Sequence, residues 1–212
     1  MTDIESLTTF REDAYRLLAA CYYPPTKELL EENCCALLAV LLDQAIPDAA
    51  QCAREAEQTM GADLEPLMVE HARLFIGPFH LVAPPYGSLY LDDARTVMGE
   101  STARVAAFYQ SCGLRLADDF HELPDHIAVE LEFLSYLAHE EREAVVMDNR
   151  DEVDRLAGLQ REFLATYLLP WLEPFTRAII DDGESPFYQA VARCTAAFVN
   201  ADNEALTAKE HA

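Results

Sequence analysis

Residues 124–137 read Pro-Asp-His-Ile-Ala-Val-Glu-Leu-Glu-Phe-Leu-Ser-Tyr-Leu, and this stretch decides the fold class. Its apolar side chains recur at the three-and-four spacing of one face of an α-helix: Ile127, Leu131, Leu134 and Leu137. Proline is tolerated in the first turn of a helix, so we place the start of this helix near Pro124. The pattern predicts an amphipathic helix with one buried face.

The same periodicity continues on both sides of this helix. We expect further helices at about residues 2–23, 26–46, 47–61, 63–76, 101–112, 156–169, 171–182 and 185–200. Strand-like alternation is lacking, and the chain has only seven glycines. The sequence therefore predicts an all-α fold, a single-domain helical bundle of about eight or nine helices over residues 1–200. Residues 201–212 are polar, and we expect them to form a frayed tail.

Residues 77–99 interrupt the helical period. Prolines and glycines break the pattern here, while aromatic and aliphatic side chains keep the segment apolar. We interpret it as an ordered loop that adds exposed aromatic rings, Tyr86 and Tyr90 among them.

Charge and composition restrict the partners of the chain. Its 212 residues carry 38 acidic against 15 basic side chains, a net charge of −23, which disfavours nucleic acid and anionic membranes and favours a cationic partner. Residues 118–154 hold 13 of the acids against Arg142 and Arg150, a local charge of −11 that overlaps residues 124–137. The sequence has neither the run of about 20 apolar residues that crosses a bilayer nor a secretory signal. We expect a soluble, cytoplasmic protein without stable membrane insertion.

The six cysteines form no Cys-x-x-Cys pair. In a reducing compartment we expect most of them to be small buried hydrophobes, with redox sensing by Cys34 and Cys35 as the alternative.

Enzyme signatures are missing from the sequence. It has no glycine-rich phosphate loop, Gly-x-Ser-x-Gly elbow, His-Glu-x-x-His motif or zinc-type Cys/His spacing, so we assign no catalytic residues, metal or cofactor. Asp125, His126 and Glu130 are the nearest candidates for metal binding or acid–base chemistry. A small helical metal-binding protein or enzyme built on these three residues stays open as the alternative, and so does a purely structural role for His126 at a helix N-terminus.

Three segments resemble the signature blocks of the TorD/DmsD chaperones, a family that includes relatives of the NarJ type. They are residues 70–78 (EHARLFIGP), 84–90 (PPYGSLY) and 122–134 (ELPDHIAVELEFL). His71 stands where the family often has an aromatic residue, and Gly87 where it often has an acidic one. Residues 163–172 add a looser likeness, so the resemblance covers roughly residues 5–200.

The resemblance implies a helical chaperone that binds the twin-arginine signal peptide of a molybdopterin-containing oxidoreductase and delays export until cofactor insertion is complete. The expected partners are this peptide and the precursor of a molybdoenzyme catalytic subunit. Some members of the family have been associated with weak guanine-nucleotide binding, but this chain has no phosphate loop, and we expect no nucleotide. The chain itself is expected to be a monomer or a homodimer. A permanent structural subunit is the third interpretation.

The resemblance and the residue pattern together suggest where the peptide binds. A twin-arginine leader combines cations with an apolar segment, so its receptor needs acidic groups beside an apolar groove. We expect the acids of residues 124–137 on one side of that groove and Ile127, Leu131 and Leu134 on the other. The predicted peptide-binding residues are Leu74, Phe75, Pro124, Asp125 and His126, followed by Tyr86, Ser88, Tyr90 and Glu130.

Overall fold

The fold was examined in a computed structural model, which describes residues 2–77, 81–93, 96–117 and 119–210. Its helices are α1 (Thr2–Ala20), α2 (Lys27–Glu31), α3 (Cys34–Leu42), α4 (Pro47–Met60), α5 (Leu64–His71), α6 (Ser88–Leu91), α7 (Glu100–Ser111), α8 (Ile127–Val146), α9 (Arg150–Phe163), α10 (Leu169–Asp182) and α11 (Pro186–Glu210). Two π-helical turns, η1 (Ala72–Ile76) and η2 (Leu164–Leu168), extend α5 and join α9 to α10. The expected all-α class is confirmed for these residues, which show one isolated β-bridge and no strand.

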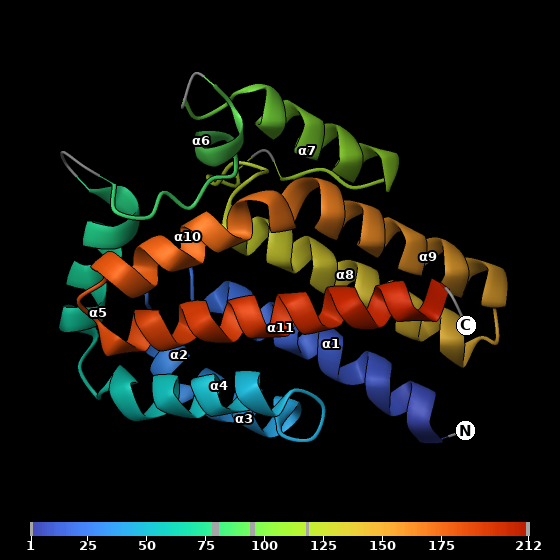
Figure 1. The fold of residues 1–212 in the computed structure, drawn as a ribbon, viewed down its shortest axis with the longest axis horizontal. Helices are drawn as coiled ribbons and strands as arrows, with labels where there is room; N and C mark the ends of the chain where they lie inside the picture. Colours follow the sequence, from blue (N-terminus) through green and yellow to red (C-terminus); the bar gives the residue numbers. More distant parts are fainter. Residues whose placement is uncertain (1, 78–80, 94–95, 118, 211–212) are drawn as a thin grey trace.

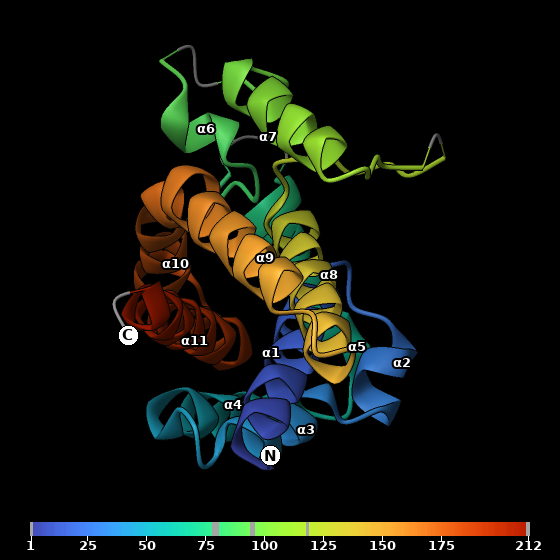
Figure 2. The same ribbon diagram turned by 90° about the vertical axis from the view of Figure 1, so that its right-hand side faces the viewer.

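The long helices pack side by side in the middle of the molecule. Helix α1 lies along α8, α11 lies along α4 and α10, and α9 lies beside α8 (Figure 1). Helices α6 and α7 lie at one end of the molecule and α3 and α4 at the opposite end (Figure 2). The helices described by the structure include none that is long and apolar enough to cross a bilayer.

The apolar stripe predicted for residues 124–137 is confirmed as the buried face of α8. Ile127, Leu131 and Leu134 are fully buried, and Leu137 is 1% exposed. The stripe packs against α1 and α9. Burial of aliphatic side chains at about 1.5–3 kcal/mol each makes this face a main source of the stability of the bundle.

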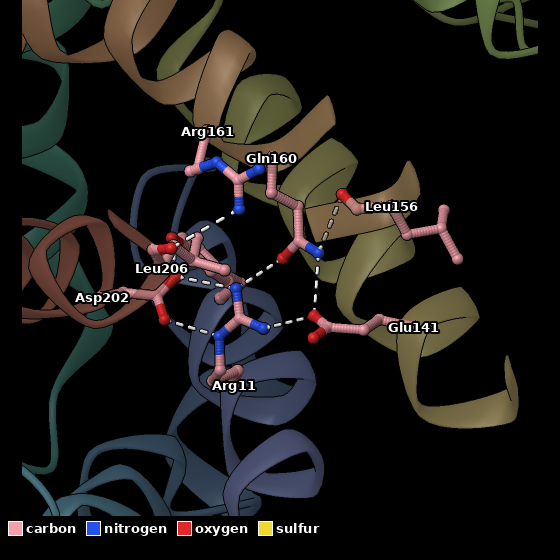
Figure 3. A network of polar contacts seen from close by, with 8 residues as sticks. Arg11, Glu141, Leu156, Gln160, Arg161, Asp202 and Leu206 are labelled. Carbon is pink, nitrogen blue, oxygen red and sulfur yellow. Dashed lines mark hydrogen bonds and ion pairs between the residues drawn. The ribbon is translucent and has the colours of Figure 1, made fainter. Parts of the chain in front are cut away.

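A buried polar network ties four helices together (Figure 3). The Arg11 guanidinium of α1 donates to Glu141 of α8 (2.6 Å), to Gln160 of α9 and to both carboxylate oxygens of Asp202 of α11. Tyr15 also donates to Asp202 (2.7 Å). All these side chains are nearly inaccessible to solvent, so each ion needs its partners to offset the loss of hydration.

Several helix boundaries differ from the sequence predictions. Helix α9 begins at Arg150 and not near residue 156, and α6 lies within the predicted loop at residues 77–99. The segment expected as one helix over residues 26–46 divides at Asn33, whose φ of +50° leaves the right-handed helical region. Helix α8 begins at Ile127 after His126, and Pro124 precedes it in a turn. Helix α11 continues to Glu210, so the prediction of a frayed tail after residue 200 is wrong. Leu206 and the Arg11 partner Asp202 hold this last part in the core.

Candidate functional site

Two of the three sequence motifs meet through their backbones. The Gly87 N–H donates to the Asp125 carbonyl (2.9 Å), and the Ile127 N–H donates to the Pro85 carbonyl (2.8 Å). These bonds surround the isolated antiparallel bridge between Tyr86 and His126. Residues 84–91 and the turn at residues 122–126 therefore form one unit at the N-terminus of α8.

The buried side chain of Asp125 joins the two segments of this unit by a hydrogen bond. This side chain is fully buried, and its Oδ2 accepts a hydrogen bond from the Ser88 backbone N–H (2.8 Å). The neighbouring Pro124 carbonyl accepts one from the Tyr109 hydroxyl of α7 (2.9 Å). Asp125 and His126 therefore do not lie on an exposed helix N-terminus, because loop and helix segments cover both residues.

His126 is the N-cap residue of α8. Its Nδ1 accepts a hydrogen bond from the Ala128 N–H (3.1 Å), which leaves the ring proton on Nε2. Burial lowers the pKa of His126 to about 4, against the opposing effect of Glu122, whose carboxylate lies 3.9 Å from Nε2. At neutral pH the ring is uncharged, the form that the capping bond requires.

Two tyrosines enclose the His126 ring. Tyr23 stacks on it with the ring centroids 5.9 Å apart and the planes at 9°, and Tyr86 meets it edge-on at 5.2 Å. The Tyr23 hydroxyl donates to Glu132 (3.0 Å), and the Tyr86 hydroxyl donates to Glu122 (2.8 Å). All four of these side chains remain at least partly exposed. We call Tyr23, Tyr86, Glu122 and Glu132 the acidic aromatic face.

A second polar group lies behind this face. Glu130 is fully buried, and its Oε2 accepts a hydrogen bond from the Trp171 indole of α10 (3.3 Å). Burial, with a further contribution from the Asp125 charge, raises the pKa of Glu130 well above its ordinary value. Tyr90 stacks on Trp171 at 5.6 Å. Tyr90 is half-buried and Ser88 is fully buried.

Gly87 is required by the close approach of the loop to Trp171. A Cβ atom at this position would lie 2.9 Å from the indole Nε1. Real Cβ contacts are longer, so a side chain cannot enter without moving the ring or the loop. The position where the family often has an acidic residue therefore has no room for a side chain in this chain.

Leu74 and Phe75 lie in the core, where they cannot line an open groove. Leu74 is fully buried and Phe75 is 4% exposed. The Phe75 ring contacts Tyr22, His71, Phe175 and Tyr188 at centroid distances of 5.0–6.2 Å. The Leu74 carbonyl accepts a hydrogen bond from the Ala83 N–H (3.0 Å), so η1 anchors the loop from below.

The expected groove wall on α8 is also absent from the surface. Ile127, Leu131 and Leu134 have no exposed area, because they form the contact with the neighbouring helices. Tyr86 and Tyr90 are half-buried, not exposed. Residues 78–80, which belong to the predicted loop, lie outside the described residues.

The acidic segment at residues 118–154 is not one local field. Glu122 and Glu132 lie at the acidic aromatic face, whereas Asp148, Asp151 and Asp154 follow the far end of α8. Fourteen residues of α8 follow Glu132, and at about 1.5 Å each they separate it from the second group by about 21 Å. Asp125, Glu130 and Glu141 are buried. The expected overlap between the acidic segment and the motif therefore reduces to a few carboxylates at the site; Asp118 lies outside the described residues.

Asp125, His126 and Glu130 are not arranged as a metal centre. Among the described residues, no three His, Cys, Asp or Glu side chains are grouped so that they could hold a metal ion. One nitrogen of His126 caps α8, and Glu130 is bonded to an indole. The arrangement offers instead two surface carboxylates and two half-exposed aromatic rings on a rigid frame.

Sequence reasoning did not name five residues as parts of this site: Tyr23, Tyr109, Glu122, Glu132 and Trp171. Tyr23 follows α1 and reaches Glu132 across 109 positions of sequence, so no local spacing pointed to the pair. The one available signal was that Glu132 lies two positions from Glu130 in the motif, on another face of the same helix.

The fold and this site define an all-helical protein with an acidic aromatic face built around a buried Asp-His turn. The model of the family described as nitrate reductase delta subunit matches residues 28–177. The chain belongs to this family, which includes the TorD and DmsD chaperones.

Curated relatives carry chaperone names. The Tat proofreading chaperone DmsD of Salmonella typhimurium is 32% identical over 121 residues, 57% of this chain and 52% of that protein. The chaperone protein TorD of Shewanella loihica is 32% identical over 69% of this chain and 65% of that protein. TorD of Aliivibrio salmonicida is 26% identical over 95% of this chain and 97% of that protein. The chain spans about half the length of the DmsD relatives that it matches.

A solved structure supports the fold. The crystal structure of a candidate redox enzyme maturation protein from Archaeoglobus fulgidus superposes with a TM-score of 0.53 at 24% identity, over 87% of this chain and 91% of that one. At this identity the likeness concerns the fold alone.

Proposed function

We propose that this chain is a cytoplasmic chaperone that binds the twin-arginine leader of a molybdopterin-containing oxidoreductase, or its precursor, during cofactor insertion and before export. It acts by binding and not by catalysis. Family membership and the names of the TorD and DmsD relatives support this proposal. The metal-binding or enzymatic alternative built on Asp125, His126 and Glu130 is not favoured.

The acidic aromatic face is the observation that carries the proposal. A guanidinium group is recognised by carboxylates through charge-assisted hydrogen bonds and by aromatic rings through cation–π contact. Glu122 and Glu132 each lie beside a half-exposed tyrosine ring, and Tyr–Glu hydrogen bonds hold both pairs. Two such pairs on either side of His126 suit two neighbouring arginines.

Apolar contacts for the rest of the leader are available in the same segments. Phe120 is 38% exposed, and Leu123 and Pro124 are partly exposed beside Glu122. Leu81, in the loop that leads to Tyr86, is 39% exposed. In this proposal Pro124 and Tyr86 touch the peptide, while the buried residues of the predicted site position them: Leu74, Phe75, Ser88, Tyr90, Asp125, His126 and Glu130.

The test combines variants of the face with variants of the peptide. The double variant Glu122→Gln/Glu132→Gln removes two charges but keeps the acceptors for the tyrosine hydroxyls. Its matched control, Glu57→Gln/Glu162→Gln, removes the same charge from exposed positions on α4 and α9. Calorimetric titrations use a leader peptide, the same peptide with both arginines changed to Gln, and one with two Leu changed to Ser.

We expect the first double variant to weaken leader binding by about tenfold, because exposed ion pairs contribute about 0–1 kcal/mol each and 1.4 kcal/mol is a factor of ten. The control should change it by less than twofold. The arginine-free peptide should no longer distinguish wild type from the Glu122/Glu132 variant. The Leu-to-Ser peptide should lose more affinity than the arginine-free one, since burying one Leu contributes about 1.5–3 kcal/mol.

Two outcomes would contradict the proposal at different levels. If the arginine-free peptide responds to the Glu122/Glu132 variant as the leader does, the arginines bind elsewhere. If the wild-type chain shows no affinity for the leader or for a leader-bearing precursor, the proposed function itself is wrong.

A further inference from the structure

Two fully buried carboxyl groups at the start of α8 are close enough for the charge of one to act on the other. Asp125 precedes the N-cap of α8, and Glu130 lies in the first turn of the same helix. Each has one oxygen engaged by a single N–H: Asp125 Oδ2 by the Ser88 backbone, and Glu130 Oε2 by the Trp171 indole. The other two oxygens, Asp125 Oδ1 and Glu130 Oε1, are buried and have no hydrogen-bond partner in the described part of the chain.

Two ionised carboxylates cannot share such an interior. A buried acceptor without a donor costs free energy, and two like charges in a medium of low dielectric constant repel each other. A proton on one group removes both problems, because a neutral carboxylic acid can donate to the carboxylate beside it. The same logic lets two neighbouring carboxyl groups of an aspartic protease share one proton.

The contacts indicate which of the two groups carries the proton. Asp125 accepts a 2.8 Å hydrogen bond from a backbone amide, the geometry that stabilises an ionised carboxylate. Glu130 has only a 3.3 Å bond from a neutral indole. Burial and the Asp125 charge both raise the pKa of Glu130. Glu130 is therefore the acid and Asp125 the acceptor.

Within the part of the chain that the structure describes, the other titratable groups around the pair supply no positive charge. Tyr109 of α7 and Tyr90 of α6 stay neutral because burial raises the pKa of each hydroxyl. His126, beside Asp125, is neutral because burial lowers its pKa. Since no cation of the described residues offsets the two carboxylates, we expect one of them to hold a proton.

We propose that Glu130 is a positioning residue that stays protonated in the folded chain and donates its carboxyl proton to Asp125, which joins α8 and α10 to residues 84–91. The bond forms a continuous link from Trp171 through Glu130 and Asp125 to Ser88. This link lies directly behind Tyr86 and His126 and holds the frame of the face. The proposal concerns the frame and stands whether or not a leader peptide is the ligand.

Infrared spectroscopy of the folded wild-type chain tests the proton directly. A protonated carboxyl group has a carbonyl band distinct from that of a carboxylate, and we expect this band at pH 7. It should disappear in Glu130→Gln and persist in the control Glu162→Gln, which changes an exposed glutamate on α9. In Asp125→Asn the amide can donate to Glu130, so the band should fade at lower pH than in the wild type.

Unfolding by urea between pH 5 and pH 8 supplies an independent measurement. A buried acid with a raised pKa binds its proton more tightly in the folded state, so its stabilising effect is complete below the unfolded pKa and is lost as pH rises towards the folded pKa. Glu130→Gln keeps both hydrogen bonds and has no proton to lose. Its folding equilibrium constant relative to wild type should therefore rise by up to tenfold per pH unit, while the ratio for Glu162→Gln stays constant.

Three results would overturn the proposal. The first is the absence of a protonated carboxyl band in the wild type at pH 7, which would leave Glu130 ionised and its oxygen bound to water. The second is a pH-independent ratio between Glu130→Gln and the wild type. The third is a stoichiometric metal ion whose removal by EDTA destabilises the chain, since a metal would then occupy the position of the proton. The infrared measurement on the wild type decides the matter even if Glu130→Gln fails to fold.

Discussion

At the scale of single residues, the site depends on side chains whose protonation and size are fixed by what surrounds them. His126 caps α8 only as a neutral ring, and Gly87 fits against Trp171 only without a Cβ atom. Both requirements come from burial by segments distant in sequence. The identity of each residue is therefore decided by packing at the site.

Gly87→Ala should destabilise the chain by about 1–3 kcal/mol, the usual cost of overpacking. The new Cβ would approach Trp171, whose ring is confined by Tyr90, Phe175 and the bond to Glu130. The matched control is Gly158→Ala in α9, where the nearest atom would be 3.8 Å away. This control should be neutral or stabilising by up to about 1 kcal/mol, because alanine is the better helix former. Equal effects in urea denaturation would show that the Trp171 contact is unimportant.

His126→Asn should change how stability depends on pH. The pKa of His126 is about 4 in the folded chain and 6.5 ordinarily, so its contribution is complete above pH 6.5 and is lost as pH falls through 4. Since one pKa unit corresponds to 1.36 kcal/mol, the loss amounts to at most about 3 kcal/mol. Asparagine caps helices well and does not titrate, so the stability difference from wild type should shrink in acid. A constant difference from pH 4 to 7 would mean that His126 titrates normally.

At the scale of helices and loops, most elements could be predicted from the sequence because their cause is local. The α8 stripe and the breaks at Pro24 and Gly113 follow from spacing and backbone preference. The start of α8 could not be predicted so well. Its N-cap is set by the bonds of residues 85 and 87 to the Asp-His turn, and the Ser88 donor to Asp125 comes from 37 positions away. From sequence alone, a carboxylate just before a helix is expected to be an exposed N-terminal cap. The burial of Asp125 depends on residues 85–88, and their position next to α8 could not be predicted.

Variants of the π-helical turn η1 test whether Leu74 and Phe75 are core residues, as the structure shows, or groove residues, as the sequence predicted. Leu74→Ala and Phe75→Ala should each cost about 2–5 kcal/mol, because both side chains are buried beneath the loop. Ile76→Ala, at a position 62% exposed in the same turn, should stay within about 0.5 kcal/mol. Denaturation midpoints measure all three. The affinity of the remaining folded protein for the leader should fall only if the loop shifts. An unchanged denaturation midpoint for Phe75→Ala would contradict the burial of Phe75 and favour a place in the surface groove.

At the scale of the whole molecule, the ends of the chain are held together by charge. Arg11 of α1 and Asp202 of α11 are 191 positions apart and form a buried ion pair that also includes Glu141 and Gln160. The sequence could not reveal it, because a polar C-terminal segment and a lone arginine both resemble solvated surface. The pairing continues α11 beyond residue 200 and buries Asp202 and Leu206 in the bundle.

Asp202→Ala tests this arrangement, since removing one partner leaves the Arg11 charge buried with less compensation. We expect a loss of about 3–5 kcal/mol, the cost of breaking a buried pair, whereas Glu204→Ala at an exposed position on α11 should be nearly silent. Arg11→Met combined with Glu141→Gln and Asp202→Leu removes all three charges and should recover much of the loss, because neutral groups of similar volume often replace a buried ion network without cost. The amide oxygen of Glu141→Gln can still accept the hydrogen bond from Gln160. Urea denaturation of the wild type and the three variants separates charge from shape. If Asp202→Ala is as stable as wild type, the Arg11–Asp202 pair does not stabilise the fold. If the triple variant is no more stable than Asp202→Ala, the loss comes from shape and not from unpaired charge.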